Sequence, residues 1–122
     1  MAELEGKRIL IVEDEYVLAS DLVEFLEERG AVIVGPVGSV SEALALAKRE
    51  PIDAAVLDVN LREERVYPVA DALIERRVPI VFATGYDELL MHRPYIGLPR
   101  FQKPIDKASL LQVLRTVVAN SR

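Results

Sequence analysis

The sequence predicts an α/β fold in which helices cover both faces of a five-stranded parallel sheet. Short apolar runs rich in Val and Ile alternate along the 122 residues with longer segments of helical periodicity. Several of these runs are apolar at consecutive positions, which is typical of strands buried on both faces. Strands that are each followed by a helical connection build parallel sheets with right-handed crossovers.

Five segments are predicted to form the strands, because each is short, apolar and rich in β-branched or aromatic residues. They are residues 8–12, 31–34, 54–57, 79–83 and, with the weakest pattern, 100–102. The segment 35–38, Gly-Pro-Val-Gly, lacks the glycine spacing and the Lys-Ser/Thr pair of a phosphate-binding loop. We therefore interpret it as a turn.

Two helices are predicted in the first half of the chain. The first covers residues 16–29 and ends before Gly30, which suits a left-handed stop. Ser39 and Glu42 have the spacing of a capping box and predict a second helix that reaches about residue 49. The residues expected to form the inward stripe of the first helix are Leu18, Leu22, Phe25 and Leu26.

The second half of the chain predicts a third helix, a short irregular connection and a last helix. The third helix is expected over residues 68–77, and Asp106 is placed to cap the last one. Prolines and glycine between residues 87 and 99 leave room for only about one or two helical turns, so this helix 4 is expected to be short or irregular. The expected inward residues are Val69, Leu73 and Ile74, then Leu110, Val113, Leu114, Val117 and Val118. Five strands connected in this way favour the flavodoxin-like order 2-1-3-4-5.

Composition narrows the classes of function. The 20 acidic and 15 basic residues give a net charge of −5 with no basic stripe, which argues against nucleic-acid binding. The absence of cysteine excludes thiolate chemistry, and the single histidine, His92, excludes a histidine cluster. A membrane span needs about 18 consecutive apolar residues, and no apolar run in this sequence approaches that length. The acidic start of the sequence lacks the apolar core of a signal peptide. We expect a single cytoplasmic domain over residues 1–122, whose chemistry rests on carboxylates, hydroxyls and lysine.

Polar side chains follow four of the predicted strands at their carboxyl ends. These residues are Glu13-Asp14-Glu15, Asp58, Thr84 and Lys103-Pro104. Ligands bind at this edge in open α/β sheets, and parallel strands bring their carboxyl ends together there. We therefore expect three carboxylates, those of Glu13, Asp14 and Asp58, to converge with one hydroxyl and one ammonium group.

These residue types indicate a phosphoryl site. Clustered carboxylates repel one another, and a hard cation that prefers oxygen ligands, Mg²⁺ above all, relieves that repulsion. Together with Mg²⁺, the Lys103 ammonium and the Thr84 hydroxyl are groups that hold a transferring phosphoryl group. An aspartate carboxylate can be the nucleophile that receives it.

At these positions the chain resembles the receiver domain of bacterial two-component response regulators, the CheY-like superfamily. The resemblance covers residues 7–120, with spacings of 44, 26 and 19 from Asp14 through Asp58 and Thr84 to Lys103. It implies Mg²⁺-dependent acceptance of a phosphoryl group on Asp58 from a histidine kinase or a histidine phosphotransfer protein.

The same resemblance implies a role for each site residue. Metal ligands would be Glu13, Asp14, Asp58 and the backbone carbonyl of Asn60. Lys103 would pair with the phosphoryl group, Thr84 would close on it as the switch, and the peptide bond before Pro104 is expected to be cis.

One departure concerns the aromatic switch residue that receivers usually carry three positions before the last lysine. Arg100 stands there, and the neighbouring Phe101 would point to the opposite face of its strand. The run from Phe82 to Tyr86 and the run from Asp58 to Arg62 instead resemble the single-domain receivers called FAT GUARD. In that interpretation Tyr86 is a candidate gate at the mouth of the site.

We expect a stand-alone signalling module with no output domain, which acts through a downstream protein partner or by passing the phosphoryl group on. It would not be an enzyme beyond its own phosphorylation and dephosphorylation, and its setting would be a bacterial stress response. One alternative is a pseudo-receiver that binds partners without phosphorylation. A phosphatase with an aspartyl nucleophile is less favoured, because Asn60 stands where its general acid would be needed.

Overall fold

The structure is a computed structural model that describes residues 3–62, 64–85, 95 and 97–120. Its core is a five-stranded sheet in the order β2-β1-β3-β6-β7, and all neighbouring strands pair in parallel. The strands are β1 (Arg8–Val12), β2 (Val32–Val37), β3 (Ala54–Asp58), β6 (Ile80–Thr84) and β7 (Arg100–Gln102). Counted along the chain, these five strands have the predicted order 2-1-3-4-5.

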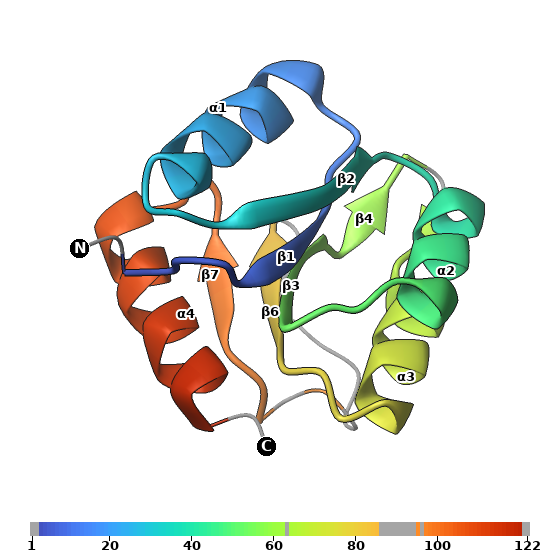
Figure 1. Ribbon diagram of the computed structural model, residues 1–122. Helices are drawn as coiled ribbons and strands as arrows, with labels where there is room; N and C mark the ends of the chain where they lie inside the picture. Colours follow the sequence, from blue (N-terminus) through green and yellow to red (C-terminus); the bar gives the residue numbers. More distant parts are fainter. Residues whose placement is uncertain (1–2, 63, 86–94, 96, 121–122) are drawn as a thin grey trace.

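Two pairs of helices cover the sheet (Figure 1). α1 (Tyr16–Glu27) and α4 (Lys107–Asn120) lie on one face, whereas α2 (Val40–Arg49) and α3 (Tyr67–Glu75) lie on the other. The predicted doubly wound α/β architecture is confirmed. The expected irregular segment 87–99 falls largely outside the described residues. None of the described helices has the length and apolar character that a membrane span needs.

The three central strands, β1, β3 and β6, are buried on both faces, as their continuous apolar runs predict. Every residue of β3 and of β6 is buried. Along β1 the side chains alternate between two cores: Ile9 and Ile11 pack towards α1 and α4, and Leu10 and Val12 pack towards α2 and α3. Burial on both faces fixes the register of these strands, because a slip of one residue would exchange the two cores.

Residues 35–37 continue β2 and do not form the turn that we expected from the Gly-Pro sequence. Gly35 has φ of +95°, and an added Cβ would lie 3.1 Å from the backbone oxygen of Ile11. The pairing with β1 shifts register between Leu10 and Val12. An edge strand tolerates a proline, which has no N–H to donate, and the shift accommodates the glycine. The extension matters for the site, because the carbonyl of Val37 accepts a hydrogen bond from the Glu13 N–H at 2.9 Å.

The helix boundaries agree with the sequence to within two residues, but two inward assignments were wrong. The Ser39 hydroxyl accepts a hydrogen bond from the Glu42 N–H at 3.2 Å, so the predicted cap of α2 is present. Leu18 and Ile74, in contrast, are 37% and 43% exposed. Each lies at the edge of its helix's apolar stripe, because other residues fill the inward positions: Ala19, Leu22 and Leu26 in α1, and Val69, Ala70 and Leu73 in α3.

Candidate functional site

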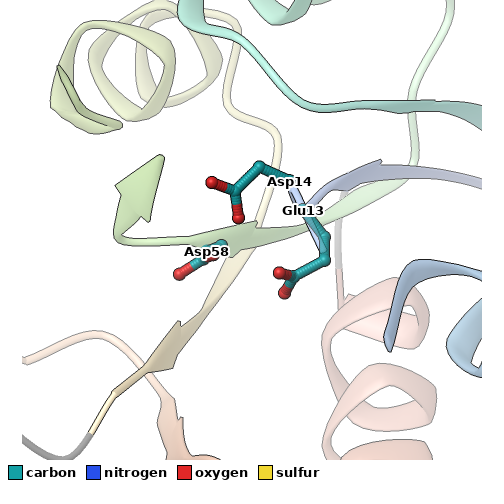
Figure 2. A group of neighbouring side chains, drawn as sticks. All are labelled: Glu13, Asp14 and Asp58. Carbon is teal, nitrogen blue, oxygen red and sulfur yellow. The ribbon is translucent and has the colours of Figure 1, made fainter. Parts of the chain in front are cut away.

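Three carboxylates meet at the carboxyl edge of the sheet (Figure 2). Glu13 and Asp14 directly follow β1, and Asp58 is the last residue of β3. One oxygen from each lies within 4.8 Å of the others. Glu13 and Asp58 are buried, with 8% and 3% of their surface exposed, whereas Asp14 is half-buried. The strand ends thus bring together the three acids that the sequence singled out.

Lys103, the first residue after β7, extends its side chain to the carboxylates. Its Nζ atom lies 3.1 Å from Oδ2 of Asp58 and 3.0 Å from Oε1 of Glu13. The Lys103 backbone N–H donates a 2.8 Å hydrogen bond to the Thr84 carbonyl, which ties its main chain to the end of β6. One ammonium group therefore bridges two buried carboxylates that are 45 residues apart in the sequence.

Burial and crowding displace the pKa values of the bridged groups. Burial, followed by the charge of Asp58, raises the pKa of Glu13 from 4.5 to about 7, although Lys103 opposes this. Burial likewise raises the pKa of Asp58, against the charge of Lys103 and its hydrogen bonds. For Lys103, burial lowers the pKa, but the hydrogen bond to Glu13 and the charge of Asp58 outweigh it and raise the pKa above the usual value. Burial is thus the main reason that both carboxyls hold a proton more tightly than exposed carboxyls do.

A two-stranded hairpin, absent from our sequence prediction, borders the site. It consists of β4 (Asn60–Leu61) and β5 (Glu64–Arg65), which pair antiparallel. The Asn60 N–H donates to Oδ1 of Asp58 at 3.2 Å, so the start of β4 orients the carboxylate. The hairpin turn contains Arg62 with φ of +57°, and arginine gives no sequence signal for a left-handed turn. Asn60, whose backbone carbonyl is an expected metal ligand, is exposed at the start of this hairpin.

Thr84 ends β6 next to the acidic group, since Ala83 pairs with Asp58. Thr84 is 4% exposed, and its hydroxyl donates to the Phe101 carbonyl at 3.4 Å. The hydroxyl therefore bonds to β7 and not to Asp58 in this structure. Arg100 is exposed, whereas Phe101 packs into the core beneath α4, so the two side chains face opposite ways as expected.

Two further expectations concern single residues. The peptide bond between Lys103 and Pro104 is cis, as the resemblance implied. The candidate gate Tyr86 lies outside the described residues, as does His92.

The donor set fits a hard divalent cation. All three converging side chains offer carboxylate oxygens, and no described residue nearby offers the nitrogen or sulfur pair that softer metals prefer. A cation of charge +2 would offset the charge of Asp58, which adds to burial in raising the pKa of Glu13.

Mg²⁺-free protein is expected to lose stability from the Glu13 carboxyl as the pH rises from about 4.5 to about 7. The folded-state pKa is raised, so the folded protein holds this proton more tightly than the unfolded chain, and the advantage disappears above the folded pKa. We expect the wild type to lose stability relative to Glu13→Gln between about pH 5 and about pH 8. The difference in the free energy of unfolding between the two proteins, measured with urea in EDTA, should change by roughly 1–3 kcal/mol in favour of Glu13→Gln. Glu24→Gln, at an exposed position of α1, is the control and should parallel the wild type. If the stability of Glu13→Gln changed with pH in the same way as that of the wild type does, the raised pKa of Glu13 would be contradicted.

The fold and the site together define a doubly wound α/β domain with three carboxylates at the carboxyl edge of its sheet, two of them bridged by a lysine. Residues 9–115 match the sequence model of the response regulator receiver domain, and the chain belongs to this family. It is therefore a receiver domain of the kind that response regulators use in two-component signalling.

Known relatives agree with this assignment. The chain is 30% identical over 120 residues to the transcriptional regulatory protein PdtaR of Mycobacterium tuberculosis, covering 95% of this chain and 58% of that protein. The chain thus spans little more than half the length of this curated relative.

Solved structures add two comparisons. The solution structure of SdrG from Sphingomonas melonis Fr1 has a TM-score of 0.81 and 41% identity, and it covers 98% of this chain and 99% of SdrG. The receiver domain of the sensor histidine kinase PA1611 from Pseudomonas aeruginosa PAO1 has a TM-score of 0.80 and 26% identity, with 93% and 98% covered. That crystal structure has a magnesium ion coordinated in the active-site cleft.

Proposed function

We propose that this receiver accepts a phosphoryl group on Asp58 in a Mg²⁺-dependent reaction. The observation that carries the proposal is the placement of the Asp58 carboxylate, buried between Lys103 and the acids that follow β1. Glu13, Asp14, Asp58 and the backbone carbonyl of Asn60 would hold the cation, which would neutralise charge on the phosphoryl oxygens.

The donor in this proposal is a phosphohistidine of a histidine kinase or of a histidine phosphotransfer protein. An oxygen of Asp58 forms a bond to phosphorus as the phosphorus–nitrogen bond breaks, and the imidazole nitrogen keeps that electron pair and takes up a proton. Lys103, 3.1 Å from the acceptor carboxylate, would exchange part of its contact with Asp58 for the negative oxygens of the incoming group. The Thr84 hydroxyl, which donates to the Phe101 carbonyl in this structure, would turn to the phosphoryl group.

The cofactor in this proposal has support from a related structure. The PA1611 receiver domain holds magnesium in its active-site cleft. The chain described here places three carboxylates at the corresponding edge of the same fold. SdrG has also been solved in a BeF₃-activated conformation, with 40% identity and a TM-score of 0.76 to this chain.

We further propose that the domain works as a single-domain regulator of the FAT GUARD type in a bacterial stress response. The supporting residues are the runs Phe82–Tyr86 and Asp58–Arg62. The domain would then act in the cytoplasm through contact with a downstream protein or by phosphoryl relay. Its chemistry would be limited to its own phosphorylation and dephosphorylation, because Asn60 cannot serve as the general acid of a phosphatase.

Intact-mass spectrometry after incubation with Mg²⁺ and acetyl phosphate tests the acceptor. The wild type is expected to gain one phosphoryl mass increment, and Asp58→Asn none, since its amide cannot act as the nucleophile. Asp21→Asn, which removes a half-exposed carboxylate of α1, is the control and should be modified as the wild type is.

A mass increment on Asp58→Asn would assign the acceptor elsewhere. If the wild type gained no mass and beryllofluoride did not shift the NMR signal of the Thr84 amide, the alternative would be favoured. In that alternative the domain is a pseudo-receiver that binds partners without phosphorylation.

A further inference from the structure

The β4–β5 hairpin places a second cation at the acidic edge. Nε of Arg62 lies 3.7 Å from Oδ2 of Asp14, and the arginine side chain is 79% exposed while that of Asp14 is 13% exposed. Among the ion pairs of the described residues, this is the one that involves Asp14. Lys103, in contrast, pairs with Glu13 and Asp58. The two cations thus divide the three carboxylates between them.

The two residues before Arg62 hold its backbone in place. The preceding residue, Leu61, is 2% exposed and packs into the core shared with α2 and α3. Next to it, Asn60 is tied to Asp58 through its backbone N–H. With both ends of β4 fixed and φ of +57° at Arg62, the arginine emerges from the turn on the side of Asp14.

A divalent cation at the three carboxylates would draw on Asp14, the same carboxylate that faces Arg62. The guanidinium and the cation are both positive and compete for one carboxylate, so binding of the cation must weaken this ion pair. The Arg62 side chain has other carboxylates within its groove to pair with when it leaves Asp14. Arg62 lines an open groove together with Glu42 and Glu64, which offer carboxylates other than the three of the acidic cluster.

We propose that Arg62 is a positioning residue that competes with the divalent cation for Asp14 and thereby sets the cation affinity of the metal-free receiver. In the metal-free protein it holds Asp14 and offsets one negative charge. On cation binding it leaves Asp14 for the groove lined by Glu42 and Glu64. The inference rests on the Mg²⁺ site of the proposed function and adds the residue that opposes Mg²⁺ binding there.

Titration with Mg²⁺ alone, followed by calorimetry and by the amide signal of Asp14, tests the competition. At about pH 8 and low salt, Arg62→Gln is expected to lower the Kd for Mg²⁺ by about two- to tenfold, as removal of one nearby positive charge predicts. The gain should shrink in about 0.5 M NaCl, because salt screens an exposed charge. Arg62→Lys keeps the charge and should stay within about twofold of the wild type.

Arg115→Gln is the control for net charge, because Arg115 is exposed on α4 and away from this edge. A Kd for Arg62→Gln that equals that of Arg115→Gln, or a gain of the same size in Arg62→Lys, would overturn the competition while leaving the Mg²⁺ site intact. A wild type that binds no Mg²⁺ under these conditions would overturn both the competition and the metal dependence of the proposed function.

Discussion

Replacing Lys103 with methionine is expected to destabilise the Mg²⁺-free protein by roughly 2–4 kcal/mol at about pH 8. Methionine has a similar length and no charge, so Glu13 and Asp58 would lose the ammonium group that lies 3.0–3.1 Å from them. Removal of one partner from a buried ion pair leaves an uncompensated charge in a poorly solvated place. Urea unfolding in EDTA measures the loss.

Two features separate this effect from a loss of packing. At about pH 5 the loss should be smaller, because both carboxyls have raised pKa values and can be neutralised by protonation. Added Mg²⁺ should recover part of it at about pH 8, since the cation replaces the missing positive charge. Lys107→Met removes a more exposed ion pair with Asp21 and should cost less than about 1 kcal/mol. A loss in Lys103→Met that is independent of pH and of Mg²⁺ would show that packing dominates.

Replacing Phe82 with alanine is expected to cost about 3–5 kcal/mol of stability. Phe82 is fully buried in β6, and its ring makes edge-to-face contacts with Tyr67 at 6.3 Å and with Tyr95 at 5.9 Å between ring centroids. The two tyrosine rings stack on each other at 4.6 Å, and the Tyr95 hydroxyl donates to Asp71 at 2.6 Å. Alanine would leave a cavity beneath the two tyrosine rings. Because these contacts hold the rings in place, the surrounding side chains can fill the cavity only in part.

Urea unfolding at a fixed pH measures this change, with two control variants. Phe82→Leu keeps most of the apolar volume and should cost about 1–1.5 kcal/mol. Val32→Ala truncates a side chain that is 43% exposed on β2 and should cost less than about 1 kcal/mol. A cost for Phe82→Ala as small as that for Val32→Ala would contradict the contribution assigned to the aromatic cluster.

The main features of the fold were predictable because they depend on local patterns. The continuous apolar runs of β3 and β6 predict strands that are buried on both faces, and the structure buries every residue of both. The Ser39 cap of α2 is likewise a matter of neighbouring residues. The errors fall where a local pattern cannot measure packing. Leu18 and Ile74 have the right spacing to face inward, but neighbouring helical positions already fill the core.

The candidate site was predictable in its membership but not in its geometry. Glu13, Asp58 and Lys103 each follow a predicted strand, and a parallel sheet must bring such strand ends to one edge. The sequence does not say which carboxylates the lysine bridges, because those contacts join residues 45 and 90 positions apart. Raised pKa values follow from that burial and are likewise a property of the assembled site.

Hydrophobic periodicity and chain connectivity are properties of the sequence, and they were enough to predict the succession of strands and helices and the polar residues at the strand ends. The tertiary structure was needed to show that β2 extends through Gly35 and Pro36, since this depends on the shifted register with β1. It alone also decided that Arg62 faces Asp14, a contact made by a hairpin turn without any turn residue to mark it. Both features depend on distant segments that fix a backbone which the local sequence leaves free.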